Sequence, residues 1–441
     1  MTYAAIAQTD APTRPVAVPL WEQWCAGYVL MMLTGALIGP ILAPDQGENP
    51  ILRLFWLPSY AVTAGLCLLR WRDLVRVWPA IVLVGLMALL AFASRYWSID
   101  PATTQRRFIA LAVNSGFALY LGARYRGVAL PRLLAMVCLW MGALSVIFVF
   151  ALPHIGIHHG VNDGLWRGIW YEKNQMGLVM VAGGISAAAW LVAEPTKRKW
   201  AMAVLALCTL LVLATASKTS LVCLVLGVGI VFAIAVIRTG GPVLVILSLW
   251  LGVVLTALGW WVWTQESAFL LGLIGKDPTL TGRTEIWDAV LEASNQRPLL
   301  GYGYNAFWGK DSVPANWIRF NTAWEVPSAH HGWLDVLLEM GWVGAIGCAL
   351  VVGTAVIAHL CRINGYGRAE GWWSLAYLAV FILLSLSESV VMTAQNLPWI
   401  LCVAALARAC DRAIVVHAPF SSAVPKGMSH PRLHTSPAGH T

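Results

Sequence analysis

Long apolar runs alternate with short polar connections along almost the whole chain. A bilayer-spanning helix needs about 20 consecutive, mostly apolar residues, and twelve runs approach this length. They cover residues 25–44, 51–69, 74–94, 108–122, 131–152, 174–193, 199–216, 219–237, 242–264, 332–359, 371–388 and 396–410. The pattern therefore predicts an all-α polytopic membrane protein with about twelve transmembrane helices.

Two polar connections are much longer than the others, at residues 153–173 and 265–331. In the second, apolar residues repeat with helical spacing from Thr281 to about Asn295, and Pro298 ends the pattern. This spacing predicts a short helix whose apolar face lies on the membrane surface.

The predicted organisation has three parts. Residues 1–24 form a cytoplasmic N-terminal segment, residues 25–410 form the transmembrane domain with the periplasmic loop 265–331 within it, and residues 411–441 form a cytoplasmic tail. The tail contains Pro, Ser, His and Gly instead of apolar runs, so we predict that it is disordered. The first twenty residues contain no apolar core of a signal peptide, so we expect the first span to direct insertion.

The composition agrees with this fold class. Of the 441 residues, 59% are hydrophobic and 11% are charged, whereas a soluble domain has about 25% charged residues. All nine cysteines lie in or beside apolar runs, without a C-x-x-C pair. They are predicted to be buried thiols, not disulfides or zinc ligands.

Basic residues mark every second connection. The residues concerned are Arg70, Arg72, Arg76, Arg124, Arg126, Arg132, Lys197, Arg198, Lys199, Arg238, Arg362, Arg368, Arg408 and Arg412. Because short cytoplasmic loops are enriched in Lys and Arg, these connections are predicted to face the cytoplasm, and the 153–173 and 265–331 loops the opposite side. The net charge of +8 then reflects topology and does not indicate nucleic-acid binding.

Three cationic segments lie on the side opposite the cytoplasm. The first, "NDGLWRGIWYEKNQMG" (162–177), places Arg167 and Lys173 just before a span. Their long side chains could reach water at the interface or bind an anion. The second is the tight hairpin "ATASKTSLVCL" (214–224), in which Lys218 stands among hydroxyls and backbone amides. Such a hairpin can bind an anion or be a simple turn with a solvated Lys.

In the third segment, "TGRTEIW" (281–287), Arg283 stands in the first turn of the predicted surface helix. A cation there opposes the helix dipole. This placement predicts an anionic partner for Arg283, supplied by the protein or by a substrate.

A fourth segment, "PSAHHGWLDVLLEMG" (327–341), opens an apolar helix with His330 and His331. On a helix, His331, Asp335 and Glu339 stack at intervals of four residues, so a carboxylate could orient an imidazole. Alternatively, both histidines mark only the start of a helix at the interface. An imidazole titrates near neutral pH and suits general base catalysis.

Several chemistries have no signature in the sequence. It contains no D-x-D, no P-loop and no G-x-G-x-x-G fingerprint, so neither a metal-held nucleotide sugar nor any other cofactor is expected. One group, His154, His158 and His159, has a spacing that could hold a metal. A lipid-linked pyrophosphate substrate fits the remaining features, because it carries its own leaving group and its tail lies in the bilayer.

In this order, the four segments resemble the O-antigen ligase/polymerase superfamily of Wzy_C-type membrane proteins, and most of all its ExoQ-like exopolysaccharide polymerases. The residues that carry the resemblance are Arg167, Gly168, Lys173, Asn174 and Gly177, then Ser217, Lys218 and Thr219, then Thr281, Gly282, Arg283, Trp287, Pro298, Gly301, Gly303 and Phe307, and last His330, Leu334, Glu339 and Gly341. A weaker match is "SRYWSIDP" at 94–101. The sequence departs from the family at His331, where Asn is usual, while Lys218 replaces the Arg of many relatives, as is common in ExoQ-like members.

The resemblance implies a bacterial inner-membrane glycosyltransferase that acts at the periplasmic face on glycans linked to undecaprenyl pyrophosphate. It implies neither metal nor nucleotide. A polymerase uses a second lipid-linked repeat unit as acceptor, whereas a ligase uses lipid A–core or a protein. A flippase and a chain-length regulator are the implied membrane partners. A polysaccharide transporter and a non-catalytic export channel are the alternatives from other classes.

With the resemblance, we assign Arg283 and Lys218, with Arg167 and Lys173, to the pyrophosphate, and His330 to the acceptor hydroxyl. Without it, His331 would be favoured because Asp335 and Glu339 could support its imidazole. Exposed faces for sugar stacking are expected from the aromatic residues of the long loop, which are Tyr302, Tyr304, Trp308, Trp317 and Trp324. Asp311 and Glu325 are possible acceptors for sugar hydroxyls.

Overall fold

The computed structural model describes residues 18–36, 50–159, 162–239, 283–322, 325–362 and 368–411. Its α-helices are α1 (Leu20–Leu33), α3 (Pro50–Leu69), α4 (Trp71–Val75), α5 (Trp78–Ala93), α6 (Pro101–Arg124), α7 (Ala129–Ala151), α8 (Pro153–Gly156), α9 (Lys173–Ala193), α10 (Arg198–Ala214), α11 (Lys218–Thr239), α13 (Arg283–Gln296), α14 (Val313–Thr322), α15 (Gly332–Arg362), α16 (Arg368–Ser385) and α17 (Leu397–Cys410). Two short 3-10 helices are η1 (Ser94–Tyr96) and η2 (Pro195–Lys197). The described ranges contain no β-strand, which confirms the all-α prediction for them.

Eleven of the twelve predicted runs coincide with helices, and the run 242–264 lies outside the described residues. Five helices of the described part are long and apolar enough to cross a membrane. They are Trp78–Tyr96, Ala129–Ala151, Lys173–Ala193, Lys218–Ile237 and Gly332–Arg362. Three shorter apolar helices, Leu54–Leu69, Gly371–Ser385 and Leu397–Cys410, pack with them.

The start of α6 differs from the prediction. The apolar run begins at residue 108, but the helix begins at Pro101, because the Asp100 side chain accepts a hydrogen bond from Thr103 N (3.0 Å) and Pro is favourable in the first turn. The polar turn that this adds carries Arg106 and Arg107. Capping thus extends the helix beyond its apolar run.

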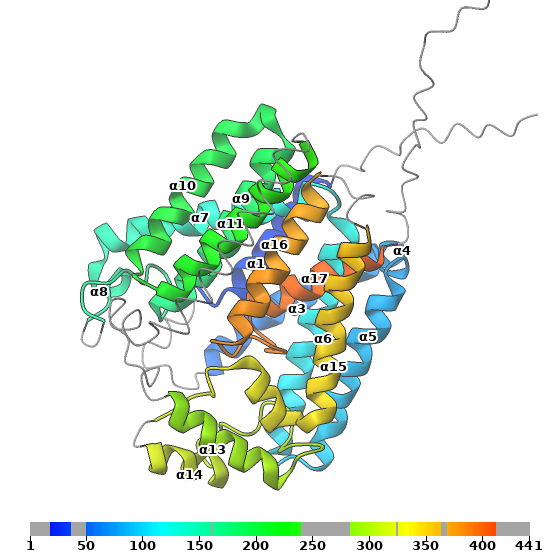
Figure 1. The fold of residues 1–441 in the computed structure, drawn as a ribbon, viewed down its shortest axis with the longest axis vertical. Helices are drawn as coiled ribbons and strands as arrows, with labels where there is room; N and C mark the ends of the chain where they lie inside the picture. The colour runs from blue at the N-terminus through cyan, green and yellow to red at the C-terminus, as the bar shows by residue number, and fades with distance from the viewer. Residues whose placement is uncertain are drawn as a thin grey trace, which may run out of the picture.

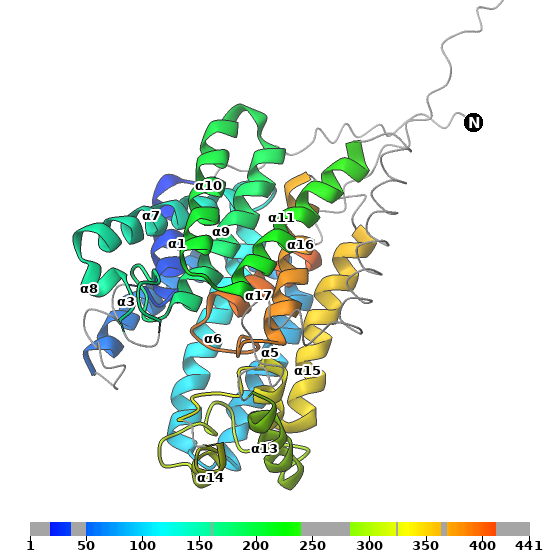
Figure 2. The same ribbon diagram turned by 60° about the vertical axis from the view of Figure 1, so that its left-hand side comes forward.

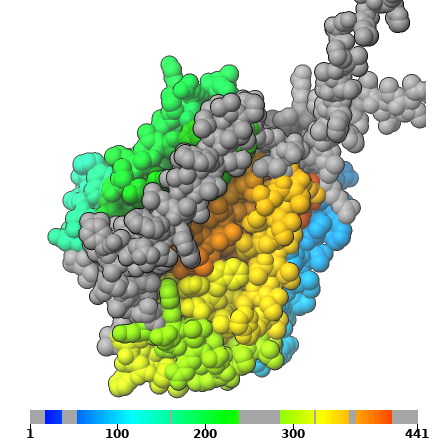
Figure 3. Space-filling view, in the orientation of Figure 1, coloured from blue at the N-terminus to red at the C-terminus, as the bar shows by residue number. Residues whose placement is uncertain are grey.

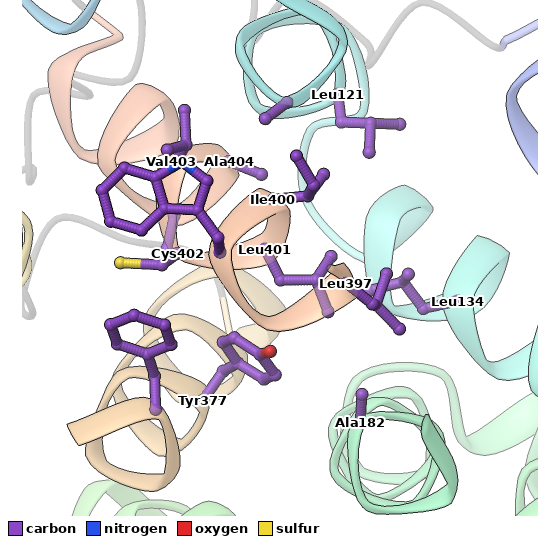
Figure 4. Packing of buried hydrophobic residues seen from close by; sticks show 14 of the residues in the cluster. Leu121, Leu134, Ala182, Tyr377, Leu397, Ile400, Leu401, Cys402, Val403 and Ala404 are labelled. Carbon is purple, nitrogen blue, oxygen red and sulfur yellow. The ribbon is translucent and has the colours of Figure 1, made fainter. Parts of the chain in front are cut away.

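The short helix α17 lies at the centre of the bundle. Almost all of its side chains are buried, and Figure 4 shows Ile400, Leu401 and Ala404 surrounded by residues of α6, α7, α9 and α16. At the closest approach, a Cβ on Gly122 of α6 would stand 2.4 Å from the Ala404 carbonyl oxygen. Small residues allow such close packing between membrane helices.

One end of the bundle collects the basic connections. Buried Glu22 in the first turn of α1 accepts hydrogen bonds from Arg70 Nη2 (2.8 Å) and from Arg124 Nε (2.8 Å). Asp411, after α17, pairs with Arg126 (2.6 Å). We call this region the basic end. The connections that carry Arg70, Arg124 and Arg126 therefore lie on one side of the bundle.

The opposite end, the motif end, carries α13 and α14 (Figures 1 and 2). The 24 residues of α6 span about 36 Å from Arg124 at the basic end to Pro101. In the first turn of α6, Thr104 Oγ1 donates to the Tyr304 carbonyl (3.0 Å). In the space-filling view, the surface of α13 and α14 continues into that of α15 (Figure 3). The motif end thus carries α13, α14 and the loop on α15, whereas the basic end carries the pairs of arginines with Glu22 and Asp411.

Glycines allow the loop between α13 and α14 to lie directly on α15. Tyr302 N donates to the Leu338 carbonyl (2.8 Å) and Gly303 N to the Glu339 carbonyl (2.9 Å). A Cβ on Gly301 would stand 2.5 Å from the Glu339 carbonyl carbon, and one on Gly341 would stand 2.3 Å from the Leu299 carbonyl carbon. Both glycines have positive φ. The glycines of the family pattern are thus required for backbone-to-backbone contact.

Candidate active site

His330 lies in the loop that leads into α15, in a backbone conformation that is rare for a residue with a side chain (φ 49°). Its N–H approaches Ser328 Oγ (3.4 Å). Its Nδ1 lies 4.0 Å from Glu388 Oε2, and the two side chains are 23% and 18% exposed. An imidazole and a carboxylate therefore face each other at the motif end, in a segment whose backbone the surrounding structure must hold.

Asp335 holds this segment. Its Oδ1 accepts hydrogen bonds from Ala329 N (3.0 Å) and from Trp308 Nε1 (2.8 Å), and its side chain is buried. The carboxylate thus ties the residue before His330 to the long loop. Glu339, one turn further along α15, is also buried, and its backbone carbonyl accepts from Gly303.

His331 has a structural environment. Its Nδ1 accepts from Leu334 N (3.3 Å), which caps the start of α15, and its ring packs edge-on against Trp287 with centroids 5.4 Å apart. Burial lowers its pKa, which favours the neutral ring that a capping acceptor requires. These contacts favour His330 over His331 as the chemically active imidazole.

Trp287 also joins α13 to the histidine segment, because its Nε1 donates to the Ala329 carbonyl (3.0 Å). Arg283 is the first residue of α13, one helical turn before Trp287. Thr281, Gly282 and the side chain of Arg283 lie outside the described part of the chain. The backbone therefore brings the third and fourth motif segments together.

The sequence analysis missed Glu388. It was included as the last residue of the predicted span 371–388, whereas α16 ends at Ser385 and leaves Glu388 in the loop before α17. One signal was present: Glu388 is the only acidic residue between residues 371 and 410. A lone carboxylate at the mouth of an apolar span is costly unless it has a partner, and His330 is such a partner.

The first segment and the hairpin also meet. A Cβ on Gly177 of α9 would stand 2.3 Å from Ser220 Oγ of α11, and Ser220 Oγ donates to Ser217 Oγ (3.0 Å). Lys218 begins α11 and is exposed. The hairpin thus packs its hydroxyls against α9 and turns its ammonium to the surface.

Part of the Arg167 guanidinium donates hydrogen bonds to carbonyls of its own loop. Its Nε donates to the Ile155 carbonyl (2.7 Å) and its Nη2 to the His154 carbonyl (3.2 Å). The guanidinium has five N–H donors, so donors remain for a ligand. Lys173 is half-buried at the first turn of α9. Within the described residues, Arg167, Lys173 and Lys218 make no ion pair with a carboxylate.

The predicted site residues thus form two groups. One contains His330, its supporting carboxylates and the start of α13, and the other contains Arg167, Lys173 and Lys218. Glu388, in the loop after α16, lies 4.0 Å from His330 Nδ1, and α16 packs against α11, the helix that Lys218 begins. The helix that leads to Glu388 therefore also contacts the helix of the second group.

The expectation for the aromatic residues is wrong in part. Tyr302 and Tyr304 are buried, and their hydroxyls donate to the carbonyls of Ala293 (3.0 Å) and Met392 (2.7 Å). Both are therefore part of the packing and offer no face to a sugar. Trp317 is 43% exposed and remains a possible stacking surface, while Trp324 lies outside the described residues.

The described part of the chain contains no group of three or more His, Cys, Asp or Glu side chains that could hold a metal ion. In the histidine group noted above, His158 Nε2 accepts from Lys173 N (3.1 Å), and His159 Nδ1 lies 3.7 Å from Asp163. These two imidazoles therefore have separate partners.

Comparisons with known proteins agree with this arrangement. The chain is 25% identical over 340 residues to the exopolysaccharide production protein ExoQ of Rhizobium meliloti (strain 1021), which covers 73% of this chain and 74% of that protein. The family described as O-antigen ligase matches residues 201–349, which include the hairpin and the third and fourth motif segments. The resemblance of this chain to the O-antigen ligase family, with an ExoQ protein among its relatives, is thereby confirmed.

Proposed function

We propose that this protein polymerises oligosaccharide repeat units carried on undecaprenyl pyrophosphate, at the periplasmic face of a bacterial inner membrane. The observation that carries the proposal is the facing pair of His330 and Glu388 (4.0 Å), beside the start of α13. It is supported by Arg167, Lys173 and Lys218, which make no ion pair with a carboxylate among the described residues. An imidazole that faces a carboxylate and a set of available cations are what glycosyl transfer from a lipid pyrophosphate requires.

In the proposed reaction, an acceptor hydroxyl attacks the anomeric carbon of the donor sugar, and the bond from that carbon to the pyrophosphate oxygen breaks. His330 takes the hydroxyl proton, and Glu388 stabilises the imidazolium that forms. The leaving lipid pyrophosphate keeps the bonding electron pair. Its charge is neutralised by Arg283 and Lys218, with Arg167 and Lys173, because cations form strong charge-assisted contacts with phosphate oxygens.

Transfer to lipid A–core, or to a protein, is the second candidate function. The specific observation in its favour is the match to the family described as O-antigen ligase. Both reactions break the same bond, so His330 and the cations serve either one. The relative named for exopolysaccharide production favours polymerisation.

A deletion strain tests this choice. If the protein is a polymerase, single repeat units should accumulate on the carrier lipid and high-molecular-weight polysaccharide should disappear. If it is a ligase, long chains should form but stay on undecaprenyl pyrophosphate. Long carrier-bound chains would overturn the polymerase assignment, and unchanged glycans in every fraction would overturn both.

Point variants test the chemistry. Removing a general base typically slows a reaction by about 10²–10⁴-fold, so His330→Ala should lose activity on that scale in the purified protein. Glu388→Gln should lose less, and the pH profile of its turnover should shift. Glu292→Gln, at an exposed site on α13, is the matched control. Full activity in His330→Ala would remove the proposed base, and inhibition by EDTA that a divalent ion reverses would contradict the metal-free reaction.

The proposed side of the membrane is tested by labelling. A cysteine at position 311 should react with an impermeant reagent in intact spheroplasts, whereas one at position 197 should react only after lysis. A cytoplasmic position 311 would place the site on the wrong side for a periplasmic reaction. Energy-dependent glycan transport without transfer by the purified protein would instead favour a transporter.

A further inference from the structure

His158 is fixed in a short hairpin next to the first motif segment. Its N–H donates to the Leu165 carbonyl (2.9 Å), and its own carbonyl accepts from Gly164 N (3.1 Å). Ile157 and Trp166 form an antiparallel bridge beside it. The residue is 7% exposed. The imidazole is therefore held by the backbone and does not move freely.

The imidazole caps a helix to which it does not belong. The first four N–H groups of an α-helix have no partner within the helix, and Glu172, which precedes α9, makes no side-chain cap. His158 Nε2 accepts the hydrogen bond from Lys173 N (3.1 Å), the first residue of α9. His158 thus occupies, from fifteen residues away, the role that a local Ser, Thr or Asp usually has.

The same hairpin positions Arg167. The N–H groups of Arg167 and Gly168 both donate to the Gly156 carbonyl (2.9 Å each), two residues before His158. The imidazole therefore connects the backbone unit that carries Arg167 to the helix that begins with Lys173. Both cations belong to the proposed pyrophosphate site.

Only the neutral imidazole can make this connection, because protonated histidine has two donors and no acceptor. The charged groups around it are Glu172, whose Oε2 lies 3.6 Å from Nε2, together with Arg167, Lys173 and His159, which in turn faces Asp163. Burial lowers the pKa of His158, and its neighbours Arg167, Lys173 and His159 lower it further. A protonated Nε2 would lose the Lys173 amide, turn toward Glu172 and oppose the dipole of α9.

We propose that His158 is a positioning residue, whose neutral imidazole holds Lys173 and Arg167 at the spacing that binds the lipid pyrophosphate. This inference rests on the proposed function of that site. Protonation in an acidic medium opens the connection. Donor binding then weakens at low pH, and this effect is separate from the chemical step at His330.

The variants His158→Ala, His158→Gln and the control His159→Gln separate these effects. Gln offers an acceptor oxygen that does not titrate. Loss of one helix cap costs about five- to tenfold in an equilibrium, so His158→Ala should raise the KM for a lipid-linked donor by about that factor at pH 7.5 while kcat changes little. His158→Gln should restore the KM and should abolish its rise between pH 7.5 and pH 5. His159→Gln should behave as the wild type does.

Two measurements do not need turnover. Amide hydrogen exchange of residues 173–176 should be faster in His158→Ala than in His158→Gln, and faster at pH 5 than at pH 7.5 in the wild type alone, after correction for the intrinsic rate. A short-chain polyprenyl pyrophosphate without a glycan should bind about five- to tenfold more weakly to His158→Ala. Unchanged exchange or unchanged binding would overturn the inference, even if the protein is an active polymerase. If these exchange and binding effects were found as expected in a protein that transfers no glycan, the proposed function would be overturned, but the positioning role of His158 would stand.

Discussion

The cations at the two ends of the bundle have different partners. At the basic end, Arg70 and Arg124 share the buried carboxylate of Glu22, and Arg126 pairs with buried Asp411. Arg132 lies 3.3 Å from Glu194. At the motif end, the described contacts of the cations are with other groups. Arg319 donates to the carbonyls of Val326, Gly309 and Trp308, and Arg297 lies over the ring of Tyr302.

This difference separates cations that hold the fold from cations that remain available to a ligand. A buried ion pair that loses one member leaves an unmatched charge, which is strongly destabilising. An exposed cation such as Lys218, which pairs with no carboxylate among the described residues, contributes little to folding and can bind an anion without breaking an ion pair there. Two carboxylates of the motif end have other partners: Asp335 holds the loop, and Glu388 faces His330.

The largest expected effect comes from removing the shared carboxylate of the basic end. Glu22→Ala leaves Arg70, Arg124 and the Tyr120 hydroxyl without their shared acceptor, so we expect a loss of about 3–5 kcal/mol in unfolding free energy. Thermal unfolding in detergent measures it. Glu292→Ala, which removes an exposed carboxylate of α13, should change stability by less than about 0.5 kcal/mol. Equal midpoints for both variants would contradict a structural role for the Glu22 cluster.

The next effect is a loss of activity that leaves the stability of the protein unchanged. Each charge-assisted contact contributes about 1.5–3 kcal/mol, so Lys218→Ala should reduce transfer by about 10–150-fold, while its unfolding midpoint stays near that of the wild type. Lys218→Arg should retain most activity. Lys197→Ala removes an exposed cation at the basic end and should leave transfer unchanged. If Lys218→Ala unfolded early or stayed fully active, the distinction between the two ends would fail for this residue.

A smaller effect tests how backbone contact holds the motif end together. Gly303 has φ 103°, and a Cβ there would stand 2.3 Å from Ser98 Oγ. Gly303→Ala should therefore cost about 1–3 kcal/mol, and this cost should not depend on salt. Gly309→Ala is the control, because its nearest neighbour would be 3.6 Å away. A stability loss that grew with ionic strength would point to electrostatics instead of backbone contact.

The sequence could predict the helices but not the contacts at their ends. Apolar runs locate α7, α9, α11 and α15 closely, because a bilayer imposes length and hydrophobicity on each segment separately. The pairing of His330 with Glu388 joins positions that are far apart in the chain. It depends on where α16 ends, and no local pattern determines this.

The candidate site was predictable in its residue types and only partly in their roles. The order of the motifs and the alternation of basic loops both predict that Lys218, Arg283 and His330 lie on one side of the membrane. The stacking of His331, Asp335 and Glu339 followed from helical spacing alone. In the structure, Asp335 accepts hydrogen bonds from Ala329 and Trp308, because the loop folds back over the helix start. Spacing along one helix cannot show what packs onto it.

The smallest effect concerns pH and distinguishes the two ends once more. Burial opposes ionisation of Glu22, but hydrogen bonds from Arg124, Arg70 and Tyr120 outweigh it and lower its pKa to about 2. A carboxyl whose folded pKa lies below the ordinary value of about 4.3 contributes its full stability above that value and loses it as the pH falls toward 2. The basic end should therefore be insensitive to pH between 5 and 8.

His158 also has a lowered pKa, so its contribution to stability is complete above its ordinary value of about 6.5 and is lost as the pH falls below it. Over this range, the unfolding free energy of the wild type should fall more than that of His158→Gln, by no more than the roughly 1 kcal/mol of one helix cap. His331, whose pKa burial also lowers, contributes equally to both. A fall of equal size in His158→Gln would assign the pH response to another group.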